Sequence, residues 1–534
     1  MKSSPFYILF FTALIALLNP GCTKKLDIAN PNVELADSLW TSAAGANQGV
    51  LATYQTFTKP GFNWWVPILK NLCSDEGWSE SPYVQLSNTM KFIYPDYNFL
   101  AGSVRGKIDD VWGTLYQGIY RANQVITYVP NIKMDDQLKA QYIGEAKFLR
   151  AYLYYTLITV FGKVPLVLVP NDSKLVDVNS TEEKDWQQVL QDLKDAEGAL
   201  PVSYSGDDRG RVTQGAAYAL RAKAYLQLRD YASAKTELDW FFTGAGNGLY
   251  SLVPNFQDNF TKLNENNSES VFEIQYSDIV PFNPSVGNFQ GFDLPNQVLG
   301  STWANFIGPQ GVPGCFSDAR ARRWPIAEFL KENTATGARD PRLGISLVYD
   351  STDVRGPDYT MVYGQTWKQR YNSTAPDLCW FHKYLNDYDP SMQNAEPLFN
   401  SPINYRVIRY ADILLLYAEC LNALGNTAAA YTYVDQVRTR ASVNMKPLSV
   451  AHPGLSQDAF FQQLRHERIV ELMGECQRWD DLKRWGDLDD ATKVAALVPG
   501  DPEFANFVVG KTRVFPIPQK EIDLNPTITQ NPNW

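Results

Sequence analysis

The chain has 534 residues, of which 45% are hydrophobic and 20% charged, so it has the composition of a globular protein with enough apolar residues for a large core. Its formal net charge of -10 disfavours nucleic acid as a partner, because a protein that neutralises phosphates needs a basic surface. The 6 cysteines are too few for a disulfide scaffold, and neither they nor the 3 histidines are spaced like the ligands of a zinc site. We therefore expect no bound metal and no cofactor.

The first residues have the pattern of an export signal. An apolar run over residues 6–18 is too short to span a bilayer, and Gly21 and Cys22 follow it closely. This pattern is typical of a bacterial lipoprotein, in which residues 1–21 are a signal peptide, Cys22 carries the lipid that holds the protein at a membrane, and residues 22–35 form a tether. Asn19 stands where such signals usually have leucine, and plain secretion with an incidental cysteine is the alternative.

Apolar residues recur at helical spacing along much of the remaining chain. They predict a helix that ends near residue 242 and further helices over 36–57, 108–129, 137–161, 182–198, 214–229, 405–424, 428–442 and 458–473. Ala222, Tyr225 and Tyr231 follow the small–aromatic pattern of a tetratricopeptide unit. The sequence therefore predicts a mainly α fold, in which helical pairs stack into a tetratricopeptide-like solenoid. The expected repeats lie over about 36–57, 108–243 and 405–485.

The segments between these helices are rich in Gly, Pro, Asn and aromatic residues, which are typical of irregular structure. We expect loops over 58–105, an irregular insert over about 245–400 with a strand at 270–276 and a short helix at 325–332, and an irregular tail over 511–534. Together with the solenoid, these segments are expected to form a single domain over residues 36–534.

Several acidic residues share helix faces, and paired carboxylates are what glycoside hydrolysis needs. They are Asp412 and Glu419 on one helix face, and Glu467, Glu471 and Glu475, which recur at four-residue spacing. Like charges at this spacing repel and are tolerated where cations are interleaved; the cations here are Arg468, Arg478, Lys483 and Arg484. We interpret these residues as a structural ion-pair network. The sequence has no GxSxG, HExxH or P-loop motif, and we expect a protein that is not an enzyme, with a surface glycosidase as the alternative.

Aromatic residues stand out in the segments that are expected to be irregular. Loops lie on surfaces, where apolar rings have little structural reason to be, and flat rings suit the apolar faces of sugars. The ring candidates for ligand binding are Trp64, Trp65, Trp78, Tyr83, Phe282 and Trp303. The candidates for hydrogen bonds to sugar hydroxyls are Asn288, Asp293 and Asn305. The alternative is that the rings pin the loops to the solenoid.

Six segments, taken together and in order, point to a known family. They are DDVWGTLYQGIYRANQVI (109–126), EAKFLRAYLYYTLITVFGKVPLV (145–167), ALRAKAYLQLRDYASA (219–234), VIRYADILLLYAECLNALG (407–425), HERIVELMGECQRWDDLKRW (466–485) and FPIPQKEIDLNPTITQNPNW (515–534). These segments resemble the SusD/RagB family of surface nutrient-binding lipoproteins of Bacteroidota, and the resemblance covers nearly the whole chain after the signal peptide. It departs from the family at Asn19 and at Thr23, Lys24 and Lys25, where acidic residues often follow the lipidated cysteine.

The resemblance implies four tetratricopeptide-like helix pairs with a loop-rich half packed on them. It also implies a lipoprotein on the external face of the outer membrane, with a SusC-like TonB-dependent transporter as partner, over which the protein lies as a lid. Family members bind oligosaccharides without hydrolysis, although some serve peptide uptake, so a peptide-binding importer subunit is an alternative. The family's ligand contacts lie in variable loops, and no ligand motif carries over residue by residue. We therefore predict a cell-surface glycan-binding lipoprotein that captures oligosaccharides and passes them to a SusC-like transporter.

Overall fold

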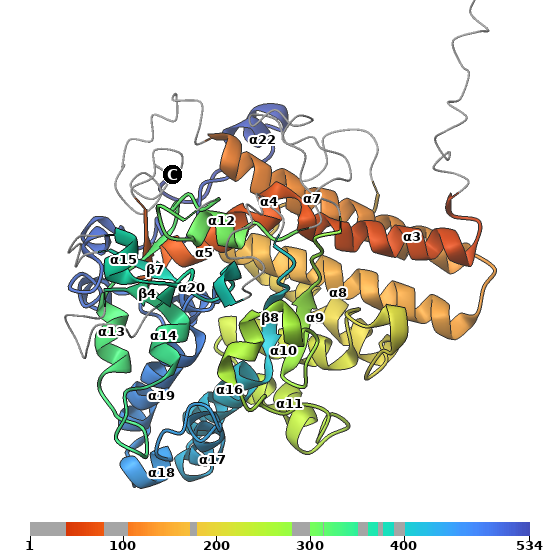
Figure 1. Cartoon of the computed structure of the whole chain (residues 1–534). Helices are drawn as coiled ribbons and strands as arrows, with labels where there is room; N and C mark the ends of the chain where they lie inside the picture. The colour runs from red at the N-terminus through yellow and green to blue at the C-terminus, as the bar shows by residue number, and fades with distance from the viewer. Residues whose placement is uncertain are drawn as a thin grey trace, which may run out of the picture.

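The computed structural model describes residues 39–79, 105–170, 179–279, 300–312, 314–350, 361–371, 378–388 and 401–534. In these residues, long helices are arranged in pairs, and a part built of short helices and strands packs against them (Figure 1). The predicted fold class, a mainly α helical-pair solenoid with an irregular part packed on it, is confirmed.

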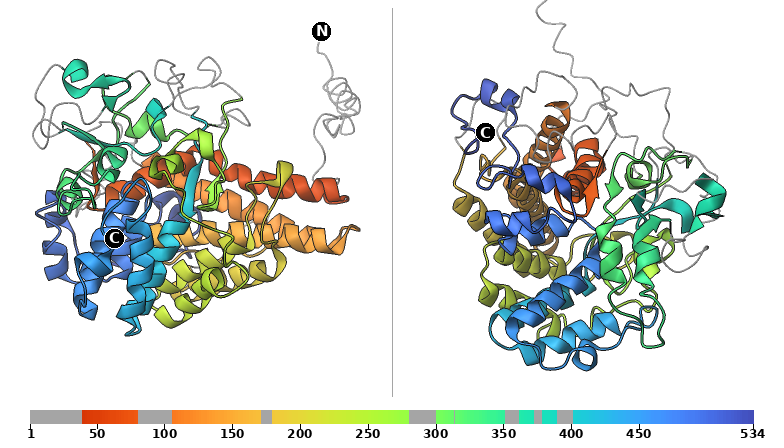
Figure 2. Two further views of the ribbon diagram at one scale, coloured as in Figure 1. Left: turned by 60° about the horizontal axis from the view of Figure 1, so that its bottom comes forward. Right: turned by 90° about the vertical axis from the view of Figure 1, so that its left-hand side faces the viewer.

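The helices of the solenoid follow one another through the molecule, and each packs against the next (Figure 2). They are α3 (Ala43–Tyr54), α7 (Arg105–Tyr128), α8 (Asp136–Phe161), α9 (Glu182–Ala199), α10 (Gln214–Gln227), α11 (Tyr231–Phe242), α16 (Tyr410–Ala423), α17 (Thr427–Arg438) and α19 (Gln457–Leu472). Helix α11 packs against α16 although the two are far apart in the sequence, so two separate stretches of chain complete one solenoid.

Short polar side chains fix where many of these helices begin. In each case the side chain of the residue before the helix accepts a hydrogen bond from a backbone N–H of the first turn, which would otherwise lack a partner. The capping residues are Ser42, Asp135, Thr181, Thr213, Asp230 and Ser456. The longest of these helices, α8, ends at Gly162, whose positive φ of 73° suits glycine.

The irregular part is held together by short antiparallel strand pairs. They are β1 (Gly77–Trp78) with β3 (Arg320–Ala321), β2 (Ser270–Ile274) with β8 (Tyr405–Arg409), β4 (Leu347–Tyr349) with β7 (Cys379–Phe381), and β5 (Met361–Val362) with β6 (Gln365–Thr366). The short helices are α4 (Pro60–Asn63), α5 (Trp65–Cys73), α12 (Trp303–Ile307), α13 (Trp324–Phe329), α14 (Arg342–Ser346), α15 (Trp367–Tyr371), α18 (Leu448–Ala451), α20 (Arg478–Arg484), α21 (Ala491–Ala495) and α22 (Gln519–Leu524). Most buried apolar side chains of this part and of the solenoid form one continuous core, and a second, smaller cluster lies among α3, α7 and α8.

Two predicted boundaries are wrong. Residues 58–105 are not all loop, because α4 and α5 occupy Pro60–Asn63 and Trp65–Cys73. Pro60 is the first residue of α4, where its missing N–H costs no hydrogen bond, so this proline begins a helix and does not break one. The helix predicted over 405–424 begins at Tyr410, since Tyr405–Arg409 form β8, which pairs with β2. The fully buried sequence YRVIR reads equally well as a strand or as a helix by its hydrophobicity.

The glutamates of α19 and the turn after it lie in a buried ion-pair network. Glu467 pairs with Arg342 at 2.6 Å and with Arg438 at 2.9 Å. Glu471 pairs with Arg409 at 2.7 Å, with Arg440 at 2.8 Å and with Arg342 at 3.0 Å. Burial works against the charge of Glu471, yet these three guanidinium groups hold its pKa well below its usual range. The interpretation of the acidic residues as a structural network is confirmed.

The three arginines among the expected cations pair with Asp412 and Glu419, which belong to the predicted network, and with further aspartates, but not with the three glutamates. Arg468 pairs with Asp412 and with Asp481, both at 2.8 Å. Arg478 pairs with Asp75 at 2.8 Å, and Arg484 binds Glu419. The glutamates of α19 share one face of the helix, because residues four apart lie side by side. Their arginine partners reach this face from α14, from β8 and from the end of α17.

Glu76 is a different kind of buried carboxyl group, because it has no ion pair within the described residues. It is 2% exposed, and its Oε2 accepts a hydrogen bond from the backbone N–H of Gly474 at 3.3 Å. Burial raises the pKa of Glu76 to about 8, against the opposing effect of Arg478. The folded protein therefore keeps this carboxyl group protonated at neutral pH.

We predict that Glu471→Gln lowers the free energy of unfolding by about 3–5 kcal/mol, because it leaves buried guanidinium groups without a full set of counter-charges. Urea denaturation of the variant and the wild type measures this difference. The exposed Glu183 on α9 supplies the control, since Glu183→Gln should change the free energy of unfolding by less than about 0.5 kcal/mol. A Glu471→Gln effect as small as that of the control would contradict a structural role for the network.

We also predict that Glu76 makes stability fall with rising pH. The unfolded chain releases this proton near pH 4.5 and the folded chain near pH 8, so between these values the folded state binds more protons. The free energy of unfolding then falls by about 1.4 kcal/mol per pH unit from this group alone. Glu76→Gln removes the titration and keeps an acceptor for Gly474. Denaturation curves should show that the free energy of unfolding of the variant, relative to that of the wild type, rises from about pH 5 to about pH 8. A difference between the two proteins that does not change with pH would refute the assignment.

Candidate functional site

The candidate site lies where α4 and α5 meet α12, at one face of the irregular part (Figure 1). Asn63, the last residue of α4, joins these elements, because its side chain donates to the Gly300 carbonyl at 2.9 Å and accepts from the backbone N–H of Thr302 at 3.2 Å. Thr302 in turn immediately precedes α12. Two segments far apart in the sequence are thus fixed side by side by one buried amide.

Four aromatic rings pack in a row across this junction, three of them stacked and the fourth tilted. The centroids of Trp65 and Trp64 are 4.9 Å apart at an interplanar angle of 10°, and those of Trp64 and Phe306 are 4.0 Å apart at 15°. Phe306 is followed by Phe316 at 5.7 Å. Trp65 and Phe306 are buried, whereas Trp64 is partly exposed and Phe316 is 42% exposed. We call Trp64 and Phe316 the aromatic platform, because they are the members of the row that reach the surface.

The loop after α12 holds Phe316 in place. The backbone N–H of Phe316 donates to the Asn305 carbonyl at 2.7 Å, and the Asn305 side chain donates to the Gly314 carbonyl at 2.7 Å. Ser317 has a positive φ of 58°, and its hydroxyl accepts a hydrogen bond from Trp380 Nε1 at 2.6 Å. The strained backbone at Ser317 is stabilised by this bond to a fully buried ring. The exposed phenyl ring is therefore carried by a rigid loop.

Three predicted binding residues are buried, which corrects the expectation that they lie on surface loops. Trp65 begins α5 and Trp303 begins α12, and each is 3% exposed. The Trp303 ring packs on Tyr384 and on Tyr405, with both centroid distances at 4.9 Å. Asn305 is 2% exposed and holds the loop after α12. These segments fold as short helices with buried faces, so their rings serve the core, as the alternative interpretation proposed.

Trp78 lies in β1 and is partly exposed. Its Nε1 donates to the Ala321 carbonyl at 3.2 Å. The guanidinium groups of Arg320 and Arg322 lie 5.3 Å and 5.0 Å from its ring centroid, within the range of cation–π contacts. The Trp78 ring is therefore already in contact with protein cations.

The remaining predicted site residues lie outside the described part of the chain. They are Tyr83, Phe282, Asn288, Asp293 and the lipidation site Cys22. Their roles stay predictions. One residue of the platform, Phe316, was not among the candidates. Gly311 and Gly314, which both have positive φ, mark the tight loop that presents its ring, and this glycine spacing was the available signal.

The site offers ring faces and backbone polar groups. Among the described residues, no three His, Cys, Asp or Glu side chains converge as the ligands of a metal ion would. The described cysteines, of which Cys315 lies in the platform loop, form no disulfide. No helix in the described segments is both long and apolar enough to cross a membrane. The arrangement is suited to non-covalent contact with a flat, partly apolar ligand.

Comparison with known proteins identifies the family. A family model described as "SusD family" matches residues 230–534, and a second, described as "Starch-binding associating with outer membrane", matches residues 69–226. Among curated proteins, the SusD-like protein P25 of Formosa agariphila is 26% identical over 446 residues, which are 79% of this chain and 78% of the relative. A SusD-like protein of Bacteroides ovatus is 24% identical over 73% of this chain and 68% of its own length.

Solved structures share the fold over nearly the whole chain. A SusD superfamily protein of Bacteroides vulgatus superposes with a TM-score of 0.76 and 25% identity, covering 93% of this chain and 100% of that one. Surface glycan-binding protein A of Bacteroides thetaiotaomicron, solved in complex with laminarihexaose, has a TM-score of 0.70 and 23% identity over 92% of this chain and 100% of its own. With the "SusD family" model covering more than half of its length, the chain belongs to the SusD/RagB family.

Proposed function

We propose that this protein is a surface glycan-binding protein that holds oligosaccharides on the aromatic platform of Trp64 and Phe316. The observation that carries the proposal is the row of packed aromatic rings in which these two side chains reach the surface. The relatives support the ligand class: one structural neighbour is described as a laminarin-binding SusD-like protein, and another was solved with laminarihexaose.

The aromatic side chains of the platform bind a sugar by contact with the apolar C–H face of the sugar ring. Trp64 is stacked between Trp65 and Phe306, which cover its two faces and leave its edge for the ligand, and Phe316 is fixed by hydrogen bonds of its loop. Neither ring therefore loses much conformational freedom on binding. Each ring contributes on the order of 1 kcal/mol. Affinity for a single short oligosaccharide is therefore modest, and longer chains gain from contacts beyond the platform.

The protein binds glycans without hydrolysing them. The carboxylates whose spacing raised the glycosidase alternative are Glu467, Glu471 and Glu475, and each is at most 1% exposed. A general acid in glycoside hydrolysis keeps its proton near neutral pH, whereas arginines hold the pKa of Glu471 well below its usual range despite its burial. Buried, ion-paired carboxylates of this kind support a scaffold role.

The protein works at the external face of the outer membrane, anchored through a lipid on Cys22, and passes its cargo to a SusC-like TonB-dependent transporter. The export signal over residues 1–21 supports the anchor. The description "Starch-binding associating with outer membrane" of the family model that matches residues 69–226 supports the location. Family membership supports the transporter as partner.

We predict that Trp64→Ala and Phe316→Ala each weaken oligosaccharide binding about fivefold, the equivalent of about 1 kcal/mol per ring. Isothermal titration of residues 23–534 against laminarihexaose, a panel of plant, host and microbial polysaccharides, and a peptide digest measures the affinities. Each mixture is then assayed for new reducing ends.

A matched control for these variants is Phe461→Ala, which removes a partly exposed ring from α19, an element that carries no platform residue. It should bind as the wild type does. Unchanged binding by the Trp64→Ala, Phe316→Ala double variant would place the ligand elsewhere. Binding heat from the peptide digest and from none of the glycans would show that the cargo is a peptide. New reducing ends would show that the protein is a glycosidase.

We predict that Cys22→Ser abolishes incorporation of radiolabelled palmitate when the protein is expressed in a host that processes bacterial lipoproteins. Cys315→Ser should leave the labelling unchanged, because Cys315 lies in the folded domain and is partly buried. Labelling that survives in the Cys22→Ser variant would rule out the proposed anchor.

A further inference from the structure

His382 directly follows β7 and is buried in the irregular part, next to α14 (Figure 1). Its Nδ1 lies 2.5 Å from the carbonyl oxygen of Gly344 in α14, and its Nε2 lies 2.8 Å from Asp387 Oδ2. Asp387 belongs to the helical turn Asn386–Tyr388, whose Tyr388 ring stacks on the imidazole at a centroid distance of 4.9 Å. The imidazole therefore joins α14 to this turn.

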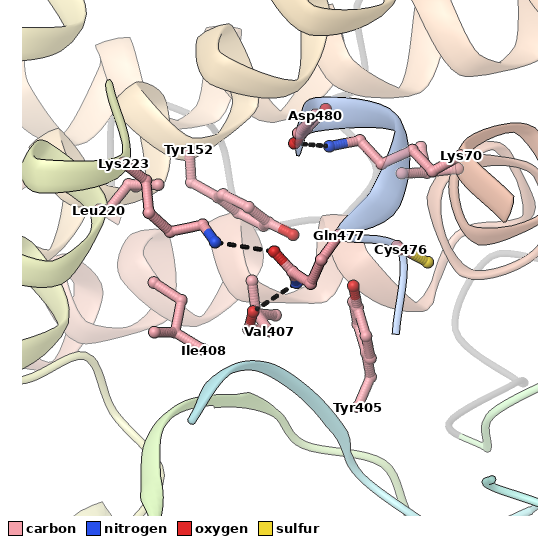
Figure 3. Close-up of a pocket in the computed structure, with 11 residues that line it drawn as sticks. Lys70, Tyr152, Leu220, Lys223, Tyr405, Val407, Ile408, Cys476, Gln477 and Asp480 are labelled. Atoms are coloured by element: carbon pink, nitrogen blue, oxygen red, sulfur yellow. Dashed lines mark hydrogen bonds and ion pairs between the residues drawn. The ribbon is translucent and has the colours of Figure 1, made fainter. Parts of the chain in front are cut away.

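Both ring nitrogens of His382 face acceptors. The buried ion pair in Figure 3 joins a donor to an acceptor, because the Lys70 ammonium donates to the Asp480 carboxylate. At His382 the Gly344 carbonyl takes the proton of Nδ1, so a neutral ring would turn the lone pair of Nε2 toward an oxygen of Asp387. A second proton on the ring removes this repulsion. The geometry therefore favours an imidazolium ion that is paired with the carboxylate.

The partners of the ring stabilise its charge. Burial disfavours a charged imidazole, but the Asp387 carboxylate and the carbonyl partner outweigh this effect and raise the pKa of His382 above its usual value of 6.5. The other titratable groups near Asp387 in the described residues are Cys315, Tyr363 and Tyr388. Burial raises the pKa of all three, that of Cys315 to about 12, so they are neutral at pH 7. The neighbouring cations Arg342 and Lys383 bind glutamates of the ion-pair network.

Hydrogen bonds connect the turn that carries Asp387 to the base of Trp64. The Asn386 side chain accepts a hydrogen bond from the Ser401 hydroxyl at 2.7 Å. Ser401 forms two backbone hydrogen bonds with Ser301, which lies between the two residues that bind the Asn63 side chain. Asn63 immediately precedes Trp64, so this platform residue depends on the turn for its support.

A second connection leads from the same turn to Phe316. The Tyr363 hydroxyl lies close to the backbone of Asn386 and 3.8 Å from Cys315 Sγ. Cys315 is the residue before Phe316, and Tyr363 is 8% exposed. The turn is therefore in contact with the supports of both platform residues.

We propose that His382 and Asp387 are positioning residues for the aromatic platform, and that protonation of the imidazole keeps the platform in its binding arrangement. This inference rests on the glycan-binding function proposed above. When the pH rises, the proton on Nε2 passes to solvent, while Nδ1 keeps its proton for Gly344. The lone pair of Nε2 then repels the carboxylate, and the turn that supports the platform loosens. The stability that this pair adds is present below the unfolded-state pKa of about 6.5 and is lost as the pH rises through the higher pKa of the folded state.

NMR of the imidazole Cε1–H signals of residues 23–534, labelled with ¹³C-histidine, tests the charge of the ring. The chain has 3 histidines, so the signal that is missing in His382→Gln assigns the resonance. If that variant does not fold, His452→Gln and His466→Gln assign it by elimination. The His382 signal should titrate above pH 6.5. A midpoint at or below this value would overturn the proposal.

The pH dependence of laminarihexaose binding tests the positioning role, because this neutral sugar does not titrate between about pH 6 and about pH 9. The affinity should fall about fivefold as the His382 signal titrates, which is the equivalent of one ring contact. In Asp387→Asn the fall should disappear, since the amide can donate an N–H to Nε2 of a neutral ring. His452→Gln, which replaces a side chain that is 43% exposed, should follow the wild-type profile. A fall that persists in Asp387→Asn would come from another group, such as Glu76, and would overturn the proposal.

Hydrogen exchange of the Phe316 N–H, which donates to the Asn305 carbonyl, reports on the platform without a glycan. Its protection factor should fall in the pH range in which His382 titrates. If it does so in a protein that binds no glycan, the positioning role stands and the proposed function fails. A glycan that binds equally well on both sides of the His382 titration would overturn the inference and leave the proposed function standing.

Discussion

The rest of the structure depends on the hydrogen bonds and ion pairs that the guanidinium group of Arg409 makes. All five of its N–H donors are used: two bonds go to the Glu475 carboxylate, one each to the carboxylates of Glu269 and Glu471, and one to the Glu471 carbonyl. Arg409 is 1% exposed and is the last residue of β8. It therefore joins the β2–β8 strand pair to α19 and to the turn after it. Buried charges are stable only when each has its partners, so this group sets where these elements can lie.

The same constraint positions the candidate site. Arg478, the first residue of α20, binds Asp75 through two bonds of 2.8 Å, and Gly474, in the turn after α19, donates to Glu76. Both acidic residues directly follow α5 and precede β1. The helix that begins after Trp64 is thus held at its far end by the ion-paired core. The platform gains rigidity from this arrangement, and a rigid ring surface binds a ligand with a smaller loss of conformational entropy.

The solenoid could be predicted from the sequence because its helices carry the periodic apolar pattern and the caps that define a helix locally. The predicted helices over 108–129, 137–161 and 182–198 correspond closely to α7, α8 and α9. The strand β8 could not be distinguished from a helix, since a short segment buried on every side has no periodicity to read. The pairing of the α19 glutamates was equally hidden, because their arginine partners come from elements that only the folded chain brings together.

The candidate site was less predictable than the fold, for a related reason. Aromatic residues in Pro- and Gly-rich segments were expected at the surface, yet Trp65 and Trp303 are buried in short helices, and Phe316 is the ring that the loop exposes. The amino-acid composition of such a segment shows that it contains aromatic rings. The path of the backbone determines which of these rings face solvent.

The central claim is that the protein holds an intact glycan on Trp64 and Phe316. The most direct measurement is a crystal structure of residues 23–534 with the oligosaccharide that binds most tightly in titration. We predict an uncleaved chain with a sugar ring stacked on the exposed Phe316 ring or packed against the exposed edge of Trp64. A ligand bound without contact to either ring, or a cleaved product, would contradict the account.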